Sequence, residues 1–255
     1  MNTASTSLAE GQASDTATEP EWRRVARFIR RPDLNEEIAP VKEGIGRLFQ
    51  LYLIDAVLMI GLAIIASAVL LSGVEIPNNT LEDIPLSPGW IAVIIIGAPL
   101  TEEILFRSWL SGKPGHLIAA LVAFAVLIVM PLVPMGDADG TSAWRAAIIV
   151  GGALAAFAAA FGLRRYGPMG WFRSLFPAIF WLATFTFAAV HLVNYETAGL
   201  LILLPLVIPQ FVAGTLFGYA RVKLGLWAAM VLHGLHNASA VTVMLIGQSM
   251  ADKTT

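Results

Sequence analysis

Two adjacent glutamates and an arginine lie within a stretch that is otherwise apolar enough to cross a membrane. Glu102, Glu103 and Arg107 belong to the predicted span 89–110. Ionisable groups in hydrocarbon cost roughly 3 kcal/mol or more each, so they usually face a bundle interior and mark a working site. Glu103 and Arg107 are four residues apart and can pair on one helix face, whereas Glu102 lies well round the helix. Glu102 is therefore the carboxylate left free for chemistry; the alternative is a purely structural ion pair.

Two later apolar segments also carry unusual polar groups. The first holds His191 and Asn194, and the second holds His233, His236 and Asn237. His233 and Asn237 are four residues apart and share a helix face. A single histidine in an apolar helix is more often a packing residue with a satisfied partner. When three spans carry such groups, the economical way to hide them from lipid is one shared polar cavity.

Such a cavity has the groups needed to hydrolyse an amide bond. A carboxylate in a low-dielectric pocket can take a proton from water and later return it to the leaving amine. Glu102 is the candidate general base, with His191 holding or helping to activate the water. The tetrahedral oxyanion needs preorganised donors, which His233 and Asn237 can supply. This chemistry requires no serine or cysteine nucleophile.

The same residues resemble the motifs of a known family, the CAAX-protease and bacteriocin-processing (CPBP or Abi) family of intramembrane proteases. Three motifs occur in order on three predicted spans: Glu102-Glu103-x-x-x-Arg107, Phe187-x-x-x-His191 and His233-x-x-x-Asn237. The resemblance covers about residues 90–240 and implies a glutamate-type intramembrane endopeptidase. It also implies a role for six residues: Glu102 as base, Glu103 with Arg107 as its supporting pair, His191 as water partner, and His233 with Asn237 as oxyanion donors.

Composition indicates that the surrounding solvent is a lipid bilayer. Of the 255 residues, 57% are hydrophobic and 13% charged, against roughly 25% charged residues in soluble domains. The net charge of −2 gives no indication of nucleic-acid binding. The absence of cysteine excludes disulfides, thiolate metal ligands and a cysteine nucleophile. Arginine outnumbers lysine and alanine is abundant, which indicates a bacterial source.

Seven apolar runs are each near the roughly 20 residues needed to cross the hydrocarbon core. We expect spans at 47–72, 89–110, 116–135, 142–163, 174–194, 198–220 and 225–247. Basic residues gather in one set of loops and acidic residues in the other, so the positive-inside rule puts the N-terminus in the cytoplasm and the C-terminus outside. The sequence therefore predicts an all-α, polytopic transmembrane bundle in the bacterial cytoplasmic (inner) membrane.

The chain divides into a membrane domain with two flanking tails. Residues 1–46 are predicted to be cytoplasmic, disordered over 1–20, with a basic amphipathic segment at 22–31. That segment fits a helix on an anionic membrane surface, or a solvated basic tail that fixes topology. Residues 47–247 form the predicted protease domain and 248–255 a short tail.

Several details of the spans carry further expectations. The spans 116–135 and 142–163 are additional to what the family resemblance implies, but an inserted pair preserves the direction of the next helix. Pro205 and Pro209 predict a kink in the sixth run. Asp55 is expected near the cytoplasmic interface, where it would be solvated.

Depth is the least consistent feature of the predicted site. At 1.5 Å per residue, Glu102 and His233 lie roughly 18 and 20 Å from the outer face, but His191 only about 5 Å. Either the boundary of the fifth span is misplaced, or that helix tilts strongly, or His191 lies outside the site; of these we expect the misplaced boundary.

The same residues leave a metal-dependent protease open. Two histidines and a carboxylate match a catalytic zinc site. Against this, Arg107 places a cation beside the candidate ligands, and no His-Glu-x-x-His signature is present. We therefore expect no cofactor, with a divalent ion such as Zn²⁺ as the alternative.

Two functions of other classes also use these residues. One is a proton-coupled carrier in which the glutamates and histidines form a relay; the other is a catalytically silent membrane scaffold or immunity protein. Transporters usually show paired repeats, and the sequence has none. The leading interpretation is an endopeptidase that cleaves a membrane-anchored or membrane-presented peptide or protein in the bilayer.

Overall fold

The computed structural model describes residues 19–34, 38–80, 86–134, 141–195 and 199–251. Within these ranges the chain forms helices and one isolated β-bridge, between Asn79 and Tyr195. The predicted all-α class is confirmed. The disorder predicted for 1–20 falls almost wholly outside the described residues, as does the end of the predicted C-terminal tail.

The helices follow one another with short connections. In chain order they are α2 (Glu21–Arg30), α3 (Val41–Leu71), α4 (Pro88–Ala92), the π-helix η1 (Val93–Gly97), α5 (Ala98–Arg107), the 3₁₀ helix η2 (Ser108–Ser111), α6 (Pro114–Val129), the 3₁₀ helix η3 (Met130–Leu132), α7 (Thr141–Gly162), α8 (Gly170–Val190), the 3₁₀ helix η4 (His191–Asn194), α9 (Leu200–Leu206), α10 (Ile208–Lys223) and α11 (Leu226–Ala251). Because α11 continues to Ala251, the predicted tail starting at 248 begins as helix.

Six stretches of the described chain are long and apolar enough to cross a membrane: Val41–Leu71, Pro88–Ser111, Pro114–Leu132, Ala143–Gly162, Gly170–Asn194 and Leu226–Met250. The protein is therefore a multi-pass membrane protein. The remaining predicted span, 198–220, is formed by α9 and α10, which are separated at Val207. The break falls between Pro205 and Pro209, because a proline ring clashes with the preceding turn and lacks a backbone donor.

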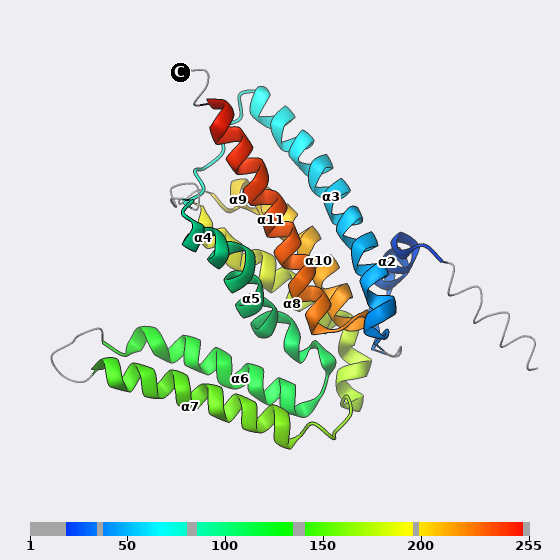
Figure 1. The fold of residues 1–255 in the computed structure, drawn as a ribbon, viewed down its shortest axis with the longest axis vertical. Helices are drawn as coiled ribbons and strands as arrows, with labels where there is room; N and C mark the ends of the chain where they lie inside the picture. The colour runs from blue at the N-terminus through cyan, green and yellow to red at the C-terminus, as the bar shows by residue number, and fades with distance from the viewer. Residues whose placement is uncertain (1–18, 35–37, 81–85, 135–140, 196–198, 252–255) are drawn as a thin grey trace, which may run out of the picture.

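Helix α10 lies at the centre of the bundle (Figure 1), with α3, α8 and α11 packed around it. All its residues from Ala213 to Lys223 are buried, as expected of a helix enclosed on every side. Helix α8 presents a stripe of buried aromatic side chains to this core: Phe172, Phe176, Phe180 and Phe187. The spacing of the first three repeats every four residues, which keeps them on one helix face.

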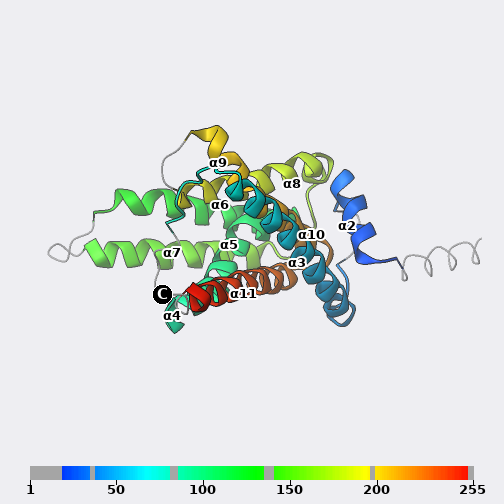
Figure 2. The same ribbon diagram turned by 90° about the horizontal axis from the view of Figure 1, so that it is seen from above.

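Helices α6 and α7 form an antiparallel pair that runs away from the rest of the bundle (Figures 1 and 2). The pair meets the bundle through contacts of α6 with η2 and α5. These are the two additional spans predicted between the first and second motifs. Because the chain leaves and returns on the same side, the bundle that carries the motifs is uninterrupted.

The basic segment near the N-terminus is helix α2, on the opposite side of the molecule from the tips of α6 and α7 (Figure 2). Val25 and Phe28 are buried against α3 and α10. Its apolar face is thus packed on the protein rather than on lipid, which neither sequence interpretation anticipated. Trp22 and the neighbouring Arg23 are exposed.

Candidate active site

The ion pair predicted on the second span is formed inside the bundle. Arg107 Nη1 donates to Glu103 Oε1 at 2.9 Å, and the two side chains are 2% and 0% exposed. His233 Nδ1 lies 2.9 Å from the same oxygen. Since the carboxylate paired with arginine can only accept, His233 donates this bond. Glu103 therefore links α5 to α11.

The end of α5 is held by the central helix. Arg221 of α10 donates from Nε to the carbonyl of Arg107 and from Nη2 to that of Ser108, both at 2.9 Å. The last carbonyls of a helix lack intrahelical partners, so a buried guanidinium there satisfies them. Gly214 of α10 leaves room for the Arg107 side chain, because a Cβ at position 214 would lie 3.1 Å from Arg107 Nη2.

A π-helix precedes α5 and receives α11. Asn237 Nδ2 donates to the carbonyl of Ile94 at 2.8 Å, and a Cβ on Gly234 would lie 3.0 Å from the carbonyl of Ile95. π-Turns are frequent at functional sites because they alter which carbonyls are available. The glycine permits the close approach, and the asparagine then fixes the register of α11 against η1.

Glu102 faces two histidines from two other helices. Its Oε2 lies 3.9 Å from His191 Nε2 and 3.9 Å from His233 Nε2. Both distances exceed a direct hydrogen bond. The side chain of Glu102 remains 28% exposed, in contrast to buried Glu103. The structure thus brings Glu102, Glu103 and Arg107 of α5 together with His191 of η4 and His233 of α11, while Asn237, one turn beyond His233, bonds to η1.

Hydrogen bonds at Nδ1 define what each imidazole offers to Glu102. His191 Nδ1 lies 2.8 Å from the carbonyl of Phe187, and a carbonyl only accepts, so Nδ1 carries the proton. A neutral His191 then presents the lone pair of Nε2. The same holds for His233, whose Nδ1 is bound to Glu103. His233 can therefore donate to an oxyanion only as the imidazolium, a condition that spacing alone did not reveal.

Aromatic rings enclose the buried charges. The guanidinium of Arg107 lies 3.6 Å from the ring centroid of Phe187, a cation–π contact. Phe217 of α10 stacks on His233 with centroids 4.5 Å apart. These rings exclude water from one side of the site, which strengthens the electrostatic interactions within it.

Three buried polar atoms at this site have no hydrogen-bond partner among the described residues: Glu102 Oε2, Glu103 Oε2 and Arg107 Nη2. Native proteins pair nearly all buried polar groups, so exceptions require an explanation. Their concentration on two adjacent carboxylates and the paired guanidinium marks a candidate place for binding or catalysis.

The structure bears on the shallow depth calculated for His191, which a misplaced boundary of the fifth span was expected to explain. Helix α8 begins at Gly170 rather than at 174, and the helical stretch ends at Asn194 as predicted. The misplaced end invoked to bring His191 into the site is therefore wrong. The stretch Gly170–Asn194 has 25 residues, more than the roughly 20 needed to cross the hydrocarbon core. Spans of that length tilt, whereas the depth expected for His191 assumed an upright helix. Asn194 itself lies outside the site, where its carbonyl accepts from Thr80.

A second buried pair was missed. Asp55 is 2% exposed, and its Oδ2 lies 2.9 Å from His236 Nδ1. The expectation that Asp55 is solvated is wrong, because α3 begins at Val41, six residues before the predicted span, and so places Asp55 near the middle of a 31-residue helix. The sequence contained a signal for this pair, because Asp55 and the unassigned His236 each lie in an apolar run.

Glu102, His191 and His233 come nearest to a metal-ligand set. Within the described ranges, however, no three His, Cys, Asp or Glu side chains are grouped closely enough to hold a metal ion. Metal dependence stays a hypothesis on chemical grounds alone.

Comparison with protein families places most of the chain in a known family. The model described as "Type II CAAX prenyl endopeptidase Rce1-like" matches residues 84–239, which include every predicted site residue and both additional helices. No curated protein matches the chain, and no solved structure matches it.

Proposed function

Because this chain belongs to the Rce1-like family of type II CAAX prenyl endopeptidases, we propose that it is an intramembrane endopeptidase in which Glu102 activates a water molecule. Membership of the family makes it a CAAX protease-type hydrolase that acts in the bilayer on a membrane-embedded protein. The residues and steps below are our proposal.

One observation carries this proposal. Glu102 Oε2 is buried without a hydrogen-bond partner in the described chain, and it faces two imidazole Nε2 atoms at 3.9 Å. The adjacent Glu103 is committed to Arg107 and His233. A general base must lie within reach of the proton it takes, directly or through one water. Glu102 meets that condition. Glu103 is not the base, because its carboxylate is already held by hydrogen bonds.

The first half of the reaction forms a tetrahedral intermediate. A water between Glu102 and His191 donates one hydrogen to Glu102 Oε2 and the other to His191 Nε2. Glu102 takes its proton as the water oxygen bonds to the substrate carbonyl carbon, whose oxygen becomes the oxyanion. Two groups donate hydrogen bonds to this oxyanion: His233, as the imidazolium held by Glu103, and the second N–H of Asn237. Removing one such donor typically slows acyl transfer by about 100-fold or more.

The second half breaks the peptide bond. The intermediate collapses, the C–N bond breaks, and Glu102 returns its proton to the leaving amine. The products are a carboxylic acid and an amine, and Glu102 is again ionised. Arg107 takes no part in bond making; it holds Glu103 ionised as the acceptor that keeps His233 in place.

The substrate we propose is a peptide or protein presented from the membrane, and the location the bacterial cytoplasmic membrane. Glu102 lies on a helix that is apolar enough to span the bilayer, so the scissile bond must enter that helix layer. The basic loops support a cytoplasmic N-terminus.

The test is cleavage of a membrane-anchored reporter-peptide library by purified wild-type protein and by His233→Ala, each with and without a strong chelator. We expect wild-type cleavage that chelator does not change, and at least about 100-fold slower cleavage by the variant. Inhibition by chelator would replace the water-activation step with a metal-dependent one. A folded wild type that cleaves no peptide would contradict the proposal.

A further inference from the structure

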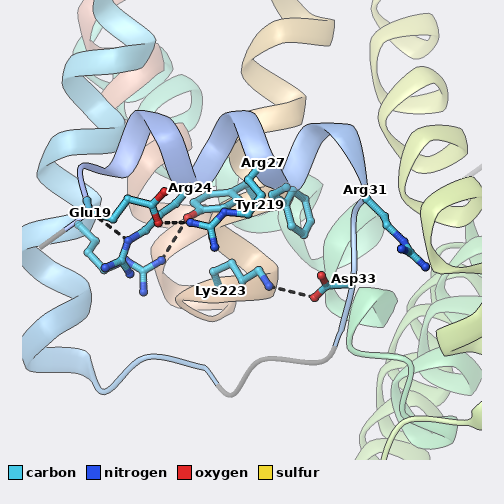
Figure 3. Close-up of a pocket in the computed structure, with 9 residues that line it drawn as sticks. Glu19, Arg24, Arg27, Arg31, Asp33, Tyr219 and Lys223 are labelled. Carbon is cyan, nitrogen blue, oxygen red and sulfur yellow. Dashed lines mark hydrogen bonds and ion pairs between the residues drawn. The ribbon is translucent and has the colours of Figure 1, made fainter. Parts of the chain in front are cut away.

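A cavity of about 270 Å³ lies beneath α2, remote in sequence from the three motifs. Figure 3 shows α2 crossing over it, with Tyr219 and Lys223 of α10 below. Nine residues line it: Glu19, Arg24, Arg27, Phe28, Arg31, Asp33, Arg47, Tyr219 and Lys223. Its volume is close to the roughly 300 Å³ at which small-molecule sites begin, which suits a headgroup rather than a whole lipid.

The lining of this cavity carries an excess of positive charge. Four arginines and one lysine face two carboxylates, and a positive excess remains when the neighbouring Glu21 is counted. Salt bridges hold some of these cations in place: Arg27 pairs with Glu19, and Lys223 Nζ lies 3.1 Å from Asp33. An arginine has five N–H donors, so a guanidinium bound to a carboxylate can still donate to a second anion.

A buried network fixes the wall of the cavity before any ligand binds. Glu21, at 2% exposure, accepts from Arg47 Nε at 2.9 Å and from the hydroxyl of Tyr219 at 2.7 Å. Phe28 packs edge-on against Tyr219, with centroids 5.2 Å apart. Groups held in place beforehand lose little conformational freedom on binding.

The surroundings of the cavity are those of a membrane interface. The elements that form the cavity also carry exposed apolar side chains: Trp22 on α2, Ile38 just before α3, and Val41 and Ile45 in the first turns of α3. Basic residues cluster at this end of the spans, which the positive-inside rule assigns to the cytoplasmic side. The cytoplasmic leaflet carries anionic lipids, and basic pockets between helices on that side bind their headgroups.

From these observations we propose that the cavity binds the phosphate of an anionic phospholipid of the cytoplasmic leaflet. The phosphate lies among the guanidinium groups under α2. The proposal does not depend on proteolysis, since none of the six proposed catalytic residues lines the cavity.

The test is binding of phosphatidylglycerol to the purified full-length protein, measured by native mass spectrometry of the folded population, with phosphatidylcholine for comparison. The cavity variant is Arg27→Gln with Arg31→Gln, two lining residues one helical turn apart. The matched control is Arg23→Gln with Arg30→Gln, which removes the same charge from the same segment outside the cavity. Arg27→Lys with Arg31→Lys retains the charge and serves as a folding control.

We expect the wild type to prefer phosphatidylglycerol, the cavity variant to bind it at least about tenfold more weakly, and the control variant to bind it within about threefold of wild type. Equal losses in the two glutamine variants would reduce the effect to surface charge and overturn the proposal. A wild type without preference for the anionic lipid would do the same. Inorganic phosphate that displaces the lipid at equal concentration would identify the ligand as free phosphate and overturn the lipid assignment.

Discussion

Two glutamate–arginine clusters join helices in this protein, and they differ in how completely their polar atoms are paired. Near the predicted cytoplasmic face, Glu21 accepts hydrogen bonds on both carboxylate oxygens, from Arg47 and Tyr219. In the membrane layer, Glu103 is bonded through Oε1 to Arg107 and His233. Its Oε2 finds no partner within the described chain.

The proposed mechanism assigns a structural role to the Glu21 cluster and a working role to the Glu103 cluster. The Glu21 cluster ties α2 to α3 and α10 and leaves no carboxylate oxygen unpaired. The Glu103 cluster holds Glu102 in front of two histidines, while Glu102 Oε2 and Arg107 Nη2 have no hydrogen-bond partner among the described residues. Unpaired buried polar groups and ionisable groups in a membrane both point to function. Each prediction below changes one member of this comparison.

Glu103→Gln is expected to have the largest effect on stability. It removes the charge opposite Arg107, which is buried, and breaking a buried pair from one side costs about 3–5 kcal/mol. Cleavage should fall as well, because the hydrogen bond of His233 Nδ1 then meets a neutral amide in place of a carboxylate. Equilibrium unfolding in detergent and the reporter assay check both effects. Unchanged stability would mean that Glu103 does not hold α5 to α11 through His233.

Gly234→Ala is expected to damage cleavage more than stability. The added Cβ would lie 3.0 Å from the carbonyl of Ile95, so α11 must move away from η1 and carry His233 and Asn237 with it. A misplacement of about 1 Å can cost about 100-fold in rate, while overpacking costs about 1–3 kcal/mol.

Gly247→Ala is the matched control for that change, because a Cβ at 247 on the same helix meets nothing within 4 Å. Its cleavage rate should equal that of the wild type. Equal cleavage by the two alanine variants would show that the contact of α11 with η1 does not position the site.

Glu21→Gln is expected to have the smallest effect of the three. Hydrogen bonds to a charged group are worth about 1.5–3 kcal/mol, so unfolding should become easier by about that amount. Cleavage per folded molecule should not change. Glu43→Gln, which alters an exposed carboxylate 3.7 Å from the same arginine, should affect neither quantity. Loss of cleavage by folded Glu21→Gln would contradict the assignment of a purely structural role to the Glu21 cluster.

Much of the site could be predicted because it depends on local spacing. Four-residue separations in apolar helices place Glu103 against Arg107, and His233 on the same face as Asn237, whatever the tertiary fold. The convergence of three polar spans followed from the cost of burying such groups in lipid.

Other features of the structure depend on where each helix begins and on how it is oriented in the bundle. Asp55 was misread because α3 starts at Val41. The depth expected for His191 did not predict its approach to Glu102, although the end of the fifth span was placed correctly. The docking of α2 through Val25 and Phe28 requires partners on α3 and α10, which periodicity within one helix cannot reveal. The protonation needed at His233 depends on a contact 130 residues away in sequence.

The most direct test of the proposed division of labour is Glu102→Gln, measured for cleavage and for unfolding in the same preparation. The substitution keeps the shape of the side chain and removes its basicity. We predict at least about 1,000-fold slower cleavage, within the range expected for loss of a general base, and unfolding unchanged from the wild type. Cleavage within about tenfold of the wild type would contradict the account, as would a loss of stability comparable to that of Glu103→Gln.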